Sequence, residues 1–440
     1  MNPLLQYPIR GEGASAIAGS VEDAIREGQL SPGSALPPVR TLAARLNVSP
    51  ATVAAAYRSL ATRGLVSGQG RRGTRVTQRP PLRTPAPVPL PAGLRDVASG
   101  NPDPALLPSL PARAIDVRPR LYGADRVRPE LLALGQRLLS ADGVPAGAVT
   151  VVGGALDGIE RVLQAHLRPG DRVAVEDPGY TGVLDLVAGL GLVPESVLLD
   201  DHGPLPASLE AALRRGVKAV IVTPRAQNPT GAAIDAGRAR ALRAILDRYT
   251  QPLLIEDDHA GPVAGREAFS LVQRRRERWA VARSVSKSLG PDLRLAFLAG
   301  DAATIARVEG RQHVGSGWVS HVLQQLVAAL LTDSAVARRL QQAERHYAER
   351  REALLEALRA HGIAAAGRSG FNVWIPVPEE QSAVAGMAAA GWAVRAGERY
   401  RLRTPPAIRV TTATLKTADA RRLAADLAAA LAGGTGTRSA

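Results

Sequence analysis

A run of prolines near residue 85 places the strongest constraint on how this chain of 440 residues can fold. Residues 77–92 have no periodic apolar face and contain six prolines, namely Pro80, Pro81, Pro85, Pro87, Pro89 and Pro91. Proline lacks an amide donor and fixes φ, so neither a helix nor a central strand can pass through this stretch. Proline-rich segments form semi-rigid, extended spacers. We therefore predict a linker over residues 79–95, between one domain at 1–78 and another at 96–432.

The residues before the linker have the pattern of a winged helix-turn-helix. Apolar residues at four-residue spacing predict a helix over residues 14–27, and a second, short helix fits within residues 35–46. Ser49 is a typical N-cap, so a third helix is expected over residues 51–63. A glycine-rich turn at residues 68–73 lies between short apolar segments and predicts a small hairpin, which would be the wing.

The charge of this N-terminal domain favours a nucleic-acid partner. The whole chain has a net charge of +15, and residues 1–90 contain eleven arginines against four acidic residues. One fifth of the chain thus carries nearly half of the excess positive charge. We predict that the partner is double-stranded operator DNA; the alternative is a small helical protein-interaction domain with a basic rim. The predicted contacts to phosphates and bases are Arg40, Ser49, Thr52, Tyr57, Arg58, Arg71, Arg72 and Arg75.

Beyond the linker, apolar strand-like segments alternate with amphipathic helical ones. This alternation predicts a mostly parallel α/β sheet. A larger part is expected at 96–333 and a smaller part at 334–432, followed by a disordered tail at 433–440. The predicted strands are 149–152, 172–175, 219–222, 253–255, 280–283, 295–298, 372–376 and 407–410, and the predicted helices are 157–167, 236–249, 335–361 and 417–431.

Lysine is rare enough in this chain to be informative. Only three lysines occur among 55 basic residues: Lys218, Lys287 and Lys416. Arginine cannot replace lysine where a neutral, nucleophilic amine is needed. Lys287 follows a predicted buried strand, with Ser284 and Ser286 before it and Arg294 after it. This pattern suits an amine that forms a Schiff base beside a bound phosphate; the alternative is an ordinary surface loop.

Other polar residues follow predicted strands, at the edge where α/β sheets bind ligands. Asn228 lies in an Asn-Pro-Thr-Gly segment, and Asp257 and His259 come directly after the strand at 253–255. A buried aspartate there can pair with a pyridinium nitrogen, although a helix N-cap would explain a single aspartate. Tyr180 follows another strand and is placed to stack on a flat ring, although a Pro-Gly turn with a tyrosine is more often structural.

Together these motifs resemble the fold-type-I pyridoxal-phosphate enzymes of the aspartate aminotransferase kind. Preceded by the winged helix, the chain is similar over about residues 10–430 to the MocR branch of the GntR transcriptional regulators. The segments at 99–104, 223–231 and 257–259 are most similar to the PtsJ-like branch, which is associated with vitamin B6 salvage. The resemblance implies an N-terminal winged helix-turn-helix and an α/β aminotransferase-like domain that binds pyridoxal 5′-phosphate.

The resemblance also implies a role for each matching residue around the cofactor ring. Lys287 would form the Schiff base, and Asp257 would pair with the pyridine nitrogen. Asn228 would hydrogen-bond the ring oxygen, and Tyr180 would stack on the ring. His259 stands where most of the family has a tyrosine beside that oxygen, which puts transaminase chemistry in doubt because a neutral histidine has a different proton balance near pH 7.

Further positions match the groups that hold phosphate and carboxylate in the family. The phosphate would be held by Ser284, Ser286, Arg294 and the backbone around Gly154 and Ala155. Tyr122 would reach the phosphate of the neighbouring subunit in a homodimer, and Arg409 would bind the carboxylate of an effector or substrate. Asn228 is the aminotransferase-like choice, where many of these regulators have an aromatic residue. Pro50 stands where the wider family often has a base-reading arginine, so an operator preference is not carried over.

These observations predict a cytoplasmic, homodimeric transcriptional regulator that senses pyridoxal phosphate, alone or with an amine or amino acid. The chain has no cysteine, which excludes disulfides and thiolate zinc sites, and no metal site is predicted. No apolar run approaches the length of a bilayer span, and the first ten residues lack the pattern of a signal peptide. The alternatives are an active aminotransferase with a DNA-binding appendage, or a DNA-bound protein whose pocket is vestigial.

Overall fold

The computed structural model describes residues 9–26, 29–31, 33–62, 65–68, 73–76, 93–110 and 121–433. The chain divides into two compact units. One comprises Met1–Val88 with the short segments Leu167–Arg172 and Asp185–Pro194, and the other comprises the rest of the chain. Most of the predicted linker, the tail at 434–440, and the wing residues Arg71 and Arg72 lie outside the described residues.

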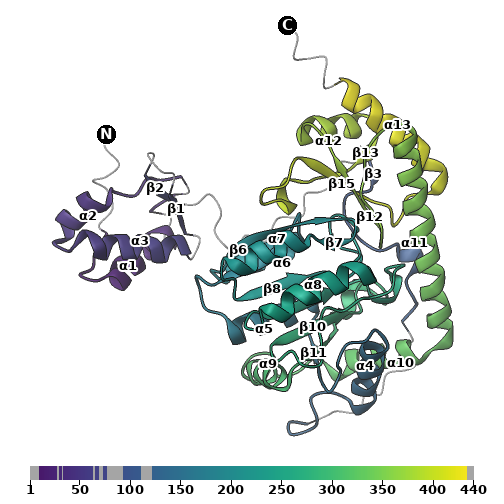
Figure 1. Ribbon diagram of the computed structural model, residues 1–440, viewed down its shortest axis with the longest axis horizontal. Helices are drawn as coiled ribbons and strands as arrows, with labels where there is room; N and C mark the ends of the chain where they lie inside the picture. The colour runs from purple at the N-terminus through teal and green to yellow at the C-terminus, as the bar shows by residue number, and fades with distance from the viewer. Residues whose placement is uncertain are drawn as a thin grey trace. The chain divides into compact units, whose positions relative to one another are not determined.

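The N-terminal unit has the predicted helical order (Figure 1). Its elements are α1 (Ala14–Arg26), α2 (Val39–Leu46), α3 (Pro50–Thr62), β1 (Val66–Gly68) and β2 (Thr74–Val76). The Ser49 hydroxyl accepts a hydrogen bond from the Thr52 amide at 3.1 Å, which confirms the predicted N-cap of α3. Ile17 and Leu60 are fully buried in a core that lies between α1 and α3. The strands β1 and β2 pair antiparallel, as expected for a wing.

An eight-stranded sheet forms the centre of the C-terminal unit, with the strand order β4-β11-β10-β9-β8-β5-β6-β7. Its strands are β4 (Ala148–Val152), β5 (Arg172–Asp177), β6 (Val193–Asp200), β7 (Gly203–Pro204), β8 (Ala219–Val222), β9 (Leu253–Asp258), β10 (Trp279–Ser284) and β11 (Ala296–Gly300). The strands β5, β8, β9 and β10 are parallel, as predicted. In contrast, β11 is antiparallel to both of its neighbours, which the apolar pattern of the sequence did not reveal.

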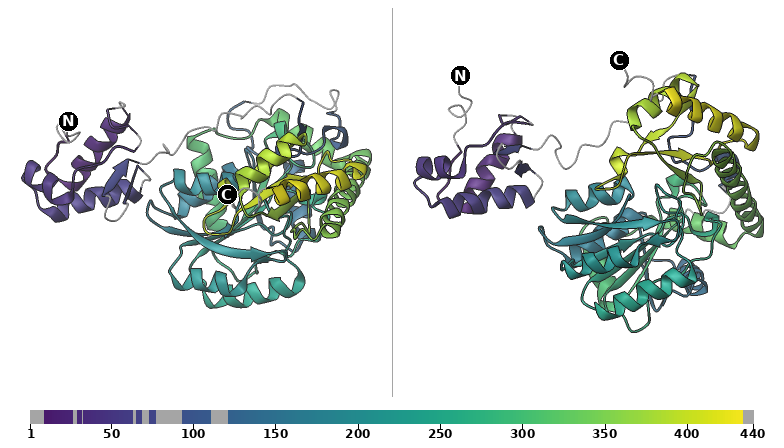
Figure 2. Two further views of the ribbon diagram at one scale, coloured as in Figure 1. Left: turned by 90° about the horizontal axis from the view of Figure 1, so that it is seen from above. Right: turned by 45° about the horizontal axis from the view of Figure 1, so that its top comes forward.

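Helices cover this sheet (Figures 1 and 2). They are α4 (Pro129–Ala141), α5 (Ala155–His166), α6 (Thr181–Gly189), α7 (Pro206–Arg214), α8 (Ala236–Arg248), α9 (Ala302–Val314) and α10 (His321–Thr332). Every residue of β8, β9 and β10 is buried, so these strands are covered on both faces and have continuous apolar stretches.

The smaller part begins with the long helix α11 (Ser334–Ala360). It also contains α12 (Glu380–Ala389), α13 (Thr417–Gly433), and a three-stranded sheet of β12 (Asn372–Pro376), β15 (Ala407–Thr411) and β14 (Arg395–Ala396). The strand β3 (Arg95–Asp96) pairs with β13 (Trp392–Ala393). Arg95, which was predicted to belong to the linker, therefore lies in a strand of the smaller part. Short 3₁₀ turns occur at Pro104–Leu106, Gly261–Val263, Pro291–Leu293 and Glu398–Tyr400.

The carboxylate of Asp177, at the end of β5, joins the larger and smaller parts. It accepts hydrogen bonds from the amides of Leu402 at 3.0 Å and Arg403 at 2.8 Å, and from the hydroxyl of Thr404 at 2.9 Å. The hydroxyl of Ser196 on β6 donates to the same carboxylate at 2.7 Å. This buried side chain is therefore saturated with donors, which compensates for the loss of water around its charge.

None of the helices in the described ranges is both long enough and apolar enough to span a membrane.

Candidate functional site

The predicted acidic residues lie inside strand β9 rather than after it. The strand continues through Asp258, and in its parallel pairing with β10 Asp257 lies opposite Ala282 and Asp258 opposite Arg283. Because successive side chains of a strand point to opposite faces, Asp257 points away from the face of Glu256 and Asp258. The sequence placed these residues at the correct edge of the sheet but did not reveal this alternation.

Asp257 is buried and incompletely paired. Its side chain is 3% exposed, and its Oδ1 atom has no hydrogen-bond partner among the described residues. Burial, with the nearby charges of Asp258 and Glu176, raises the pKa of Asp257 to about 7. Buried acceptors without a donor are rare in folded proteins. A cationic N–H group, such as a pyridinium nitrogen, would satisfy this oxygen and favour the ionised carboxylate.

The amine of Lys287 lies in the loop after β10. Its Nζ donates a hydrogen bond to the Gly100 carbonyl at 2.7 Å and lies 5.6 Å from the centre of the Phe371 ring. Burial and the positive charge of Arg409 lower the pKa of Lys287 to about 8. A larger share of this amine is neutral near pH 7 than for an exposed lysine, which suits a nucleophile that condenses with an aldehyde.

Arg409 links the predicted carboxylate site to the predicted ring site. It lies on β15, is 3% exposed, and donates through Nη1 to the Asn228 side-chain oxygen at 3.0 Å. Its Nη2 donates to the carbonyl of Ala98, and the guanidinium lies 5.2 Å from the centre of the Tyr400 ring. Because the Asn228 oxygen accepts from Arg409, the amide NH₂ of Asn228 is left to donate to a ring oxygen.

The structure brings Arg294 to the N-terminus of α5, beside Gly154. Gly154 has φ of +111°, and a Cβ atom there would lie 2.9 Å from Nη2 of Arg294. Ala155 begins α5, whose free amide groups and dipole favour an anion. Ser284 lies at the end of β10 and its hydroxyl accepts from the Ser286 amide at 3.1 Å. The φ of +111° favours glycine at position 154, because L side chains rarely adopt it.

Tyr180 and His259 each lie near charged groups of the site, Tyr180 near Asp257 and His259 near Lys287. Burial and the negative charge of Asp257 raise the pKa of Tyr180, which places its ring near the carboxylate predicted to pair with the pyridine nitrogen. Burial and the charge of Lys287 lower the pKa of His259 to about 4. His259 is therefore neutral near pH 7 and can donate only one hydrogen bond.

Tyr122 is not brought to this site by its own chain. Its side chain is 93% exposed and contacts Trp318 edge to face, with 5.8 Å between the ring centres. The expected contact with a neighbouring subunit stays a prediction.

A buried cluster of two arginines and two aspartates lies beside the site, and sequence reasoning missed it. Arg225 donates through Nε and Nη2 to the two oxygens of Asp258 at 3.1 and 2.9 Å. Arg225 and Arg283 also pair with Asp142 at 2.9 and 2.8 Å. Although burial opposes ionisation, the two arginines lower the pKa of Asp258 to about 2. The only signal for this cluster was the presence of Arg225 and Arg283 inside the two motifs already singled out.

Glu176 organises the loop that carries Asn228, and it was also missed. Its carboxylate accepts from the amide and the hydroxyl of Thr223, both at 2.9 Å, and from the Gln227 side chain at 3.1 Å. The Gln227 oxygen in turn accepts from the amide of Thr230 at 3.0 Å. Burial raises the pKa of Glu176 to about 7 in spite of these bonds. The network orders both sides of Asn228.

The predicted DNA contacts are only partly on the surface. Arg40, Ser49 and Arg58 are exposed, and Thr52 is half-buried beside Ser49. Tyr57 was predicted as a contact, but its side chain is 6% exposed and its hydroxyl donates to the Pro37 carbonyl at 2.8 Å. Tyr57 is therefore a core residue, because its position on α3 faces the other helices.

Of the three arginines predicted to contact DNA from the wing, only Arg75 lies within the described residues. Arg75 donates to the Gly33 carbonyl at 2.8 Å and is half-buried, so it supports the base of the wing. Arg71 and Arg72 lie outside the described residues.

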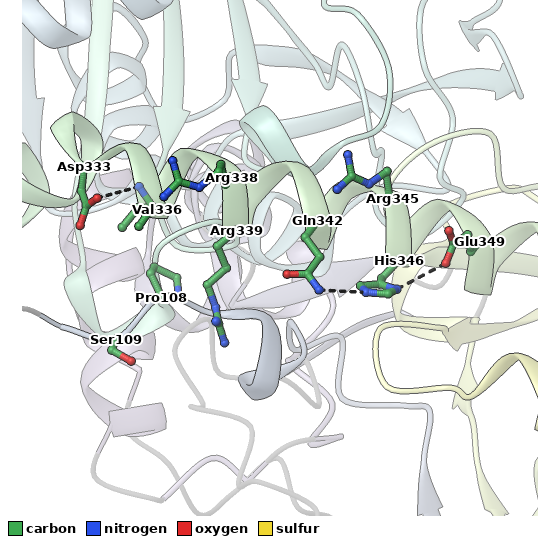
Figure 3. Close-up of a pocket in the computed structure, with 11 residues that line it drawn as sticks. Pro108, Ser109, Asp333, Val336, Arg338, Arg339, Gln342, Arg345, His346 and Glu349 are labelled. Atoms are coloured by element: carbon green, nitrogen blue, oxygen red, sulfur yellow. Dashed lines mark hydrogen bonds and ion pairs between the residues drawn. The ribbon is translucent and has the colours of Figure 1, made fainter.

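A groove of about 660 Å³ runs along α11 (Figure 3). Its walls include Pro108, Ser109, Arg338, Arg339 and His346, none of which was predicted as a site residue. Arg339 donates to the Leu107 carbonyl at 2.9 Å, and His346 pairs with Glu349 at 3.3 Å. Arg339 and His346, two of the basic residues in this groove, therefore already have partners within the chain.

Two protein families match this chain. Residues 14–76 match the family described as "Bacterial regulatory proteins, gntR family", and residues 112–427 match "Aminotransferase class I and II". These ranges correspond to the winged helix-turn-helix and to the aminotransferase-like domain, so the predicted fold class is confirmed.

Two relatives share both halves of the chain. The vitamin B6 salvage pathway transcriptional repressor PtsJ of Salmonella typhimurium is 43% identical over 432 residues, which is 96% of this chain and 99% of PtsJ. The HTH-type transcriptional regulator TauR of Rhodobacter capsulatus is 30% identical over 415 residues, which is 81% of this chain and 82% of TauR.

Among solved structures, the kynurenine aminotransferase of Pyrococcus horikoshii has a similar fold. It superposes with a TM-score of 0.71 at 20% identity and covers 78% of this chain and 92% of its own. At this level of identity the likeness concerns the fold alone.

Proposed function

We propose that this chain, which belongs to the MocR-type transcriptional regulators of the GntR family, controls transcription in response to pyridoxal 5′-phosphate. One observation carries the proposal. The buried, unpaired oxygen of Asp257 lies in the same site as the amine of Lys287, whose pKa is about 8, in a chain that also has a winged helix-turn-helix. A pyridinium ring with an aldehyde satisfies both groups at once.

The residues of this chain would each do one part of the binding. Lys287 supplies the amine for the aldehyde, and Asp257 holds the proton on the ring nitrogen. Asn228 donates to the ring oxygen, and Tyr180 covers one ring face. The backbone at Gly154 and Ala155, with Arg294, Ser284 and Ser286, binds the phosphate. When bound, the cofactor supplies an electron-withdrawing ring and a carbonyl carbon that captures amines.

We further propose that the regulated genes belong to vitamin B6 metabolism, because PtsJ is named for that pathway and matches almost the whole chain. As a regulator of DNA the protein would act in the cytoplasm, as a homodimer. The side chain of Tyr122, which is 93% exposed and lies against the half-buried Trp318, is available for a subunit contact.

Operator binding tests this proposal directly. We would measure affinity for the DNA upstream of the gene itself and of B6-related genes, with and without pyridoxal phosphate, at two salt concentrations. Wild type should show a ligand-dependent shift that Lys287→Ala lacks. Tight binding that ignores pyridoxal phosphate in both proteins would contradict the proposed effector.

A second candidate function is an active aminotransferase, supported by the bond between Arg409 and Asn228. With this contact, Arg409 would be available to bind a substrate carboxylate next to Asn228, as a transaminase needs. Against it stands His259, which is neutral near pH 7 where the family has a phenol. Steady-state transamination with an amino acid and a keto acid decides the matter, with Lys287→Ala as the inactive control.

A further inference from the structure

We propose that the backbone segment 98–101, called the strap below, acts as a latch. Ligand binding breaks the hydrogen bonds that hold the strap, and the resulting change in its position reaches the linker. The inference rests on the proposed function for the identity of the ligand. The contacts of the strap itself do not depend on that function.

The strap lies against the two cations of the site. The Gly100 carbonyl accepts from Lys287 at 2.7 Å, and the Ala98 carbonyl accepts from Arg409. The fit at Gly100 is close, because its φ is +71° and a Cβ atom there would lie 3.0 Å from Nη2 of Arg409. Two carbonyls of one short segment thus hold the amine and the guanidinium that a ligand would need.

Both ends of the strap are anchored in the C-terminal unit. On the N-terminal side, the Val97 amide donates to Ala393 at 3.1 Å and the Val97 carbonyl accepts from Thr411 at 2.8 Å. On the C-terminal side, the Asp103 amide donates to the Tyr347 hydroxyl at 3.0 Å, and Arg350 pairs with the Asp103 carboxylate at 2.8 Å. The strap therefore spans the site between two fixed points.

A ligand competes with the strap for each cation. Condensation of the neutral Lys287 amine with an aldehyde forms a C=N bond and releases the aldehyde oxygen with both amine hydrogens as water. A neutral C=N nitrogen has no N–H, and a protonated one has a single N–H fixed in the plane of the double bond, so the freely rotating N–H that bonds to Gly100 would be lost. A ligand carboxylate that pairs with Arg409 competes in the same way with the Ala98 carbonyl, because a charged acceptor binds a guanidinium more strongly than a neutral one.

The strap also lies close to the linker in the sequence. Between them lies β3, which pairs with β13 through only two residues, Arg95 and Asp96. The Asp96 carboxylate accepts from the amides of Ala98 and Ser99, both at 2.9 Å, so the strand and the strap are joined directly. A change in the strap is therefore applied to β3, the two-residue strand that lies between the strap and the linker.

Hydrogen exchange of the strap amides in the full-length protein tests the latch. The first arm has no ligand and compares wild type with Gly100→Ala, Lys287→Ala and the control Gly216→Ala. Gly216 has φ of +78° but open space around it, so its replacement adds the same backbone strain without touching the site. We expect exchange at residues 98–101 to rise about tenfold in the first two variants and to stay unchanged in the control. Lys287→Ala removes the donor to the Gly100 carbonyl, and the Cβ of Gly100→Ala would crowd the Arg409 guanidinium that binds the Ala98 carbonyl.

The second arm adds pyridoxal phosphate and follows its visible absorbance when bound to lysine. If the absorbance appears, hydrogen exchange of the strap in wild type should rise to the level of Gly100→Ala. The change in operator affinity that pyridoxal phosphate causes should be at least tenfold smaller in Gly100→Ala than in wild type. If the absorbance appears while the strap stays protected, the latch is wrong. If no absorbance appears, the proposed function fails, and the first arm alone decides the latch. Unchanged hydrogen exchange of the strap in both Gly100→Ala and Lys287→Ala would overturn the latch.

Discussion

Asp257 and Asp258 are neighbours on β9, yet their pKa values are shifted in opposite directions, to about 7 and about 2. The cause is the alternation of the strand. One carboxylate points to a buried position without a donor, and the other points to Arg225 and Arg283. A single strand therefore presents one carboxylate that needs a cationic partner and one that already has two.

The first prediction concerns Asp257 in the ligand-free protein. Its pKa is higher in the folded chain than in the unfolded one, so ionisation costs stability as the pH rises from about 4 to about 7. At pH 8, Asp257→Asn should therefore unfold at a higher temperature than wild type, because its free energy of unfolding is higher by an amount on the order of 2–4 kcal/mol. This difference in free energy should be smaller at pH 5. Thermal unfolding at both pH values measures it. The exposed Asp125→Asn is the control, and no gain at pH 8 would contradict the account.

The second prediction concerns the charge cluster. Asp258→Asn leaves Arg225 and Arg283 with Asp142 as their remaining carboxylate, so it should lower the free energy of unfolding by about 3–5 kcal/mol. Asp142 is 25% exposed, so water can replace part of its role, and Asp142→Asn should cost clearly less. Urea unfolding of both variants compares them. If both variants lost the same free energy of unfolding, the greater burial of Asp258 would not contribute to its effect on stability.

The third prediction concerns the rate at which Lys287 captures pyridoxal phosphate. With a pKa of about 8, about a quarter of the amine is neutral at pH 7.5, compared with roughly one part in a thousand for an ordinary lysine. The capture rate, followed by visible absorbance, should rise with pH and level off just above pH 8. A rate that still rises between pH 9 and pH 10 would mean that the amine is not shifted.

The fourth prediction separates a core residue from a DNA contact on α3. Tyr57→Phe removes the hydrogen bond to Pro37 and should cost about 1 kcal/mol of stability. It should leave the dependence of operator affinity on salt unchanged. Arg58→Ala should leave stability unchanged and reduce that salt dependence by about one phosphate contact. If Tyr57→Phe changed the salt dependence while Arg58→Ala did not, our assignment of the two residues would be reversed.

Local signals in the sequence were sufficient for the winged helix-turn-helix and the buried strands β8, β9 and β10, and they singled out most of the predicted cofactor residues, but α4, α6, α7, α9, α10 and α12 were not predicted. The Ser49 cap, the apolar strands and the position of Lys287 after a buried strand depend on neighbours in the chain, so they can be read from one stretch at a time. The family resemblance then supplied residues such as Arg409 and Tyr122, which lie far apart in the sequence.

The remaining features depend on packing between distant segments. The pairing of Arg225 with Asp142, the bond from Lys287 to Gly100 and the antiparallel direction of β11 each join residues that no local pattern connects. Tyr57 shows the same limit at short range. An amphipathic tyrosine on a recognition helix has the same sequence pattern whether its hydroxyl faces DNA or the core.

The saturated carboxylate of Asp177 has a consequence for motion inside the C-terminal unit. Three donors from Leu402, Arg403 and Thr404 converge on this one side chain of the large sheet. Sliding of residues 402–404 past the end of β5 would break all three bonds together. Asp177 therefore resists this displacement more strongly than a carboxylate with a single donor would.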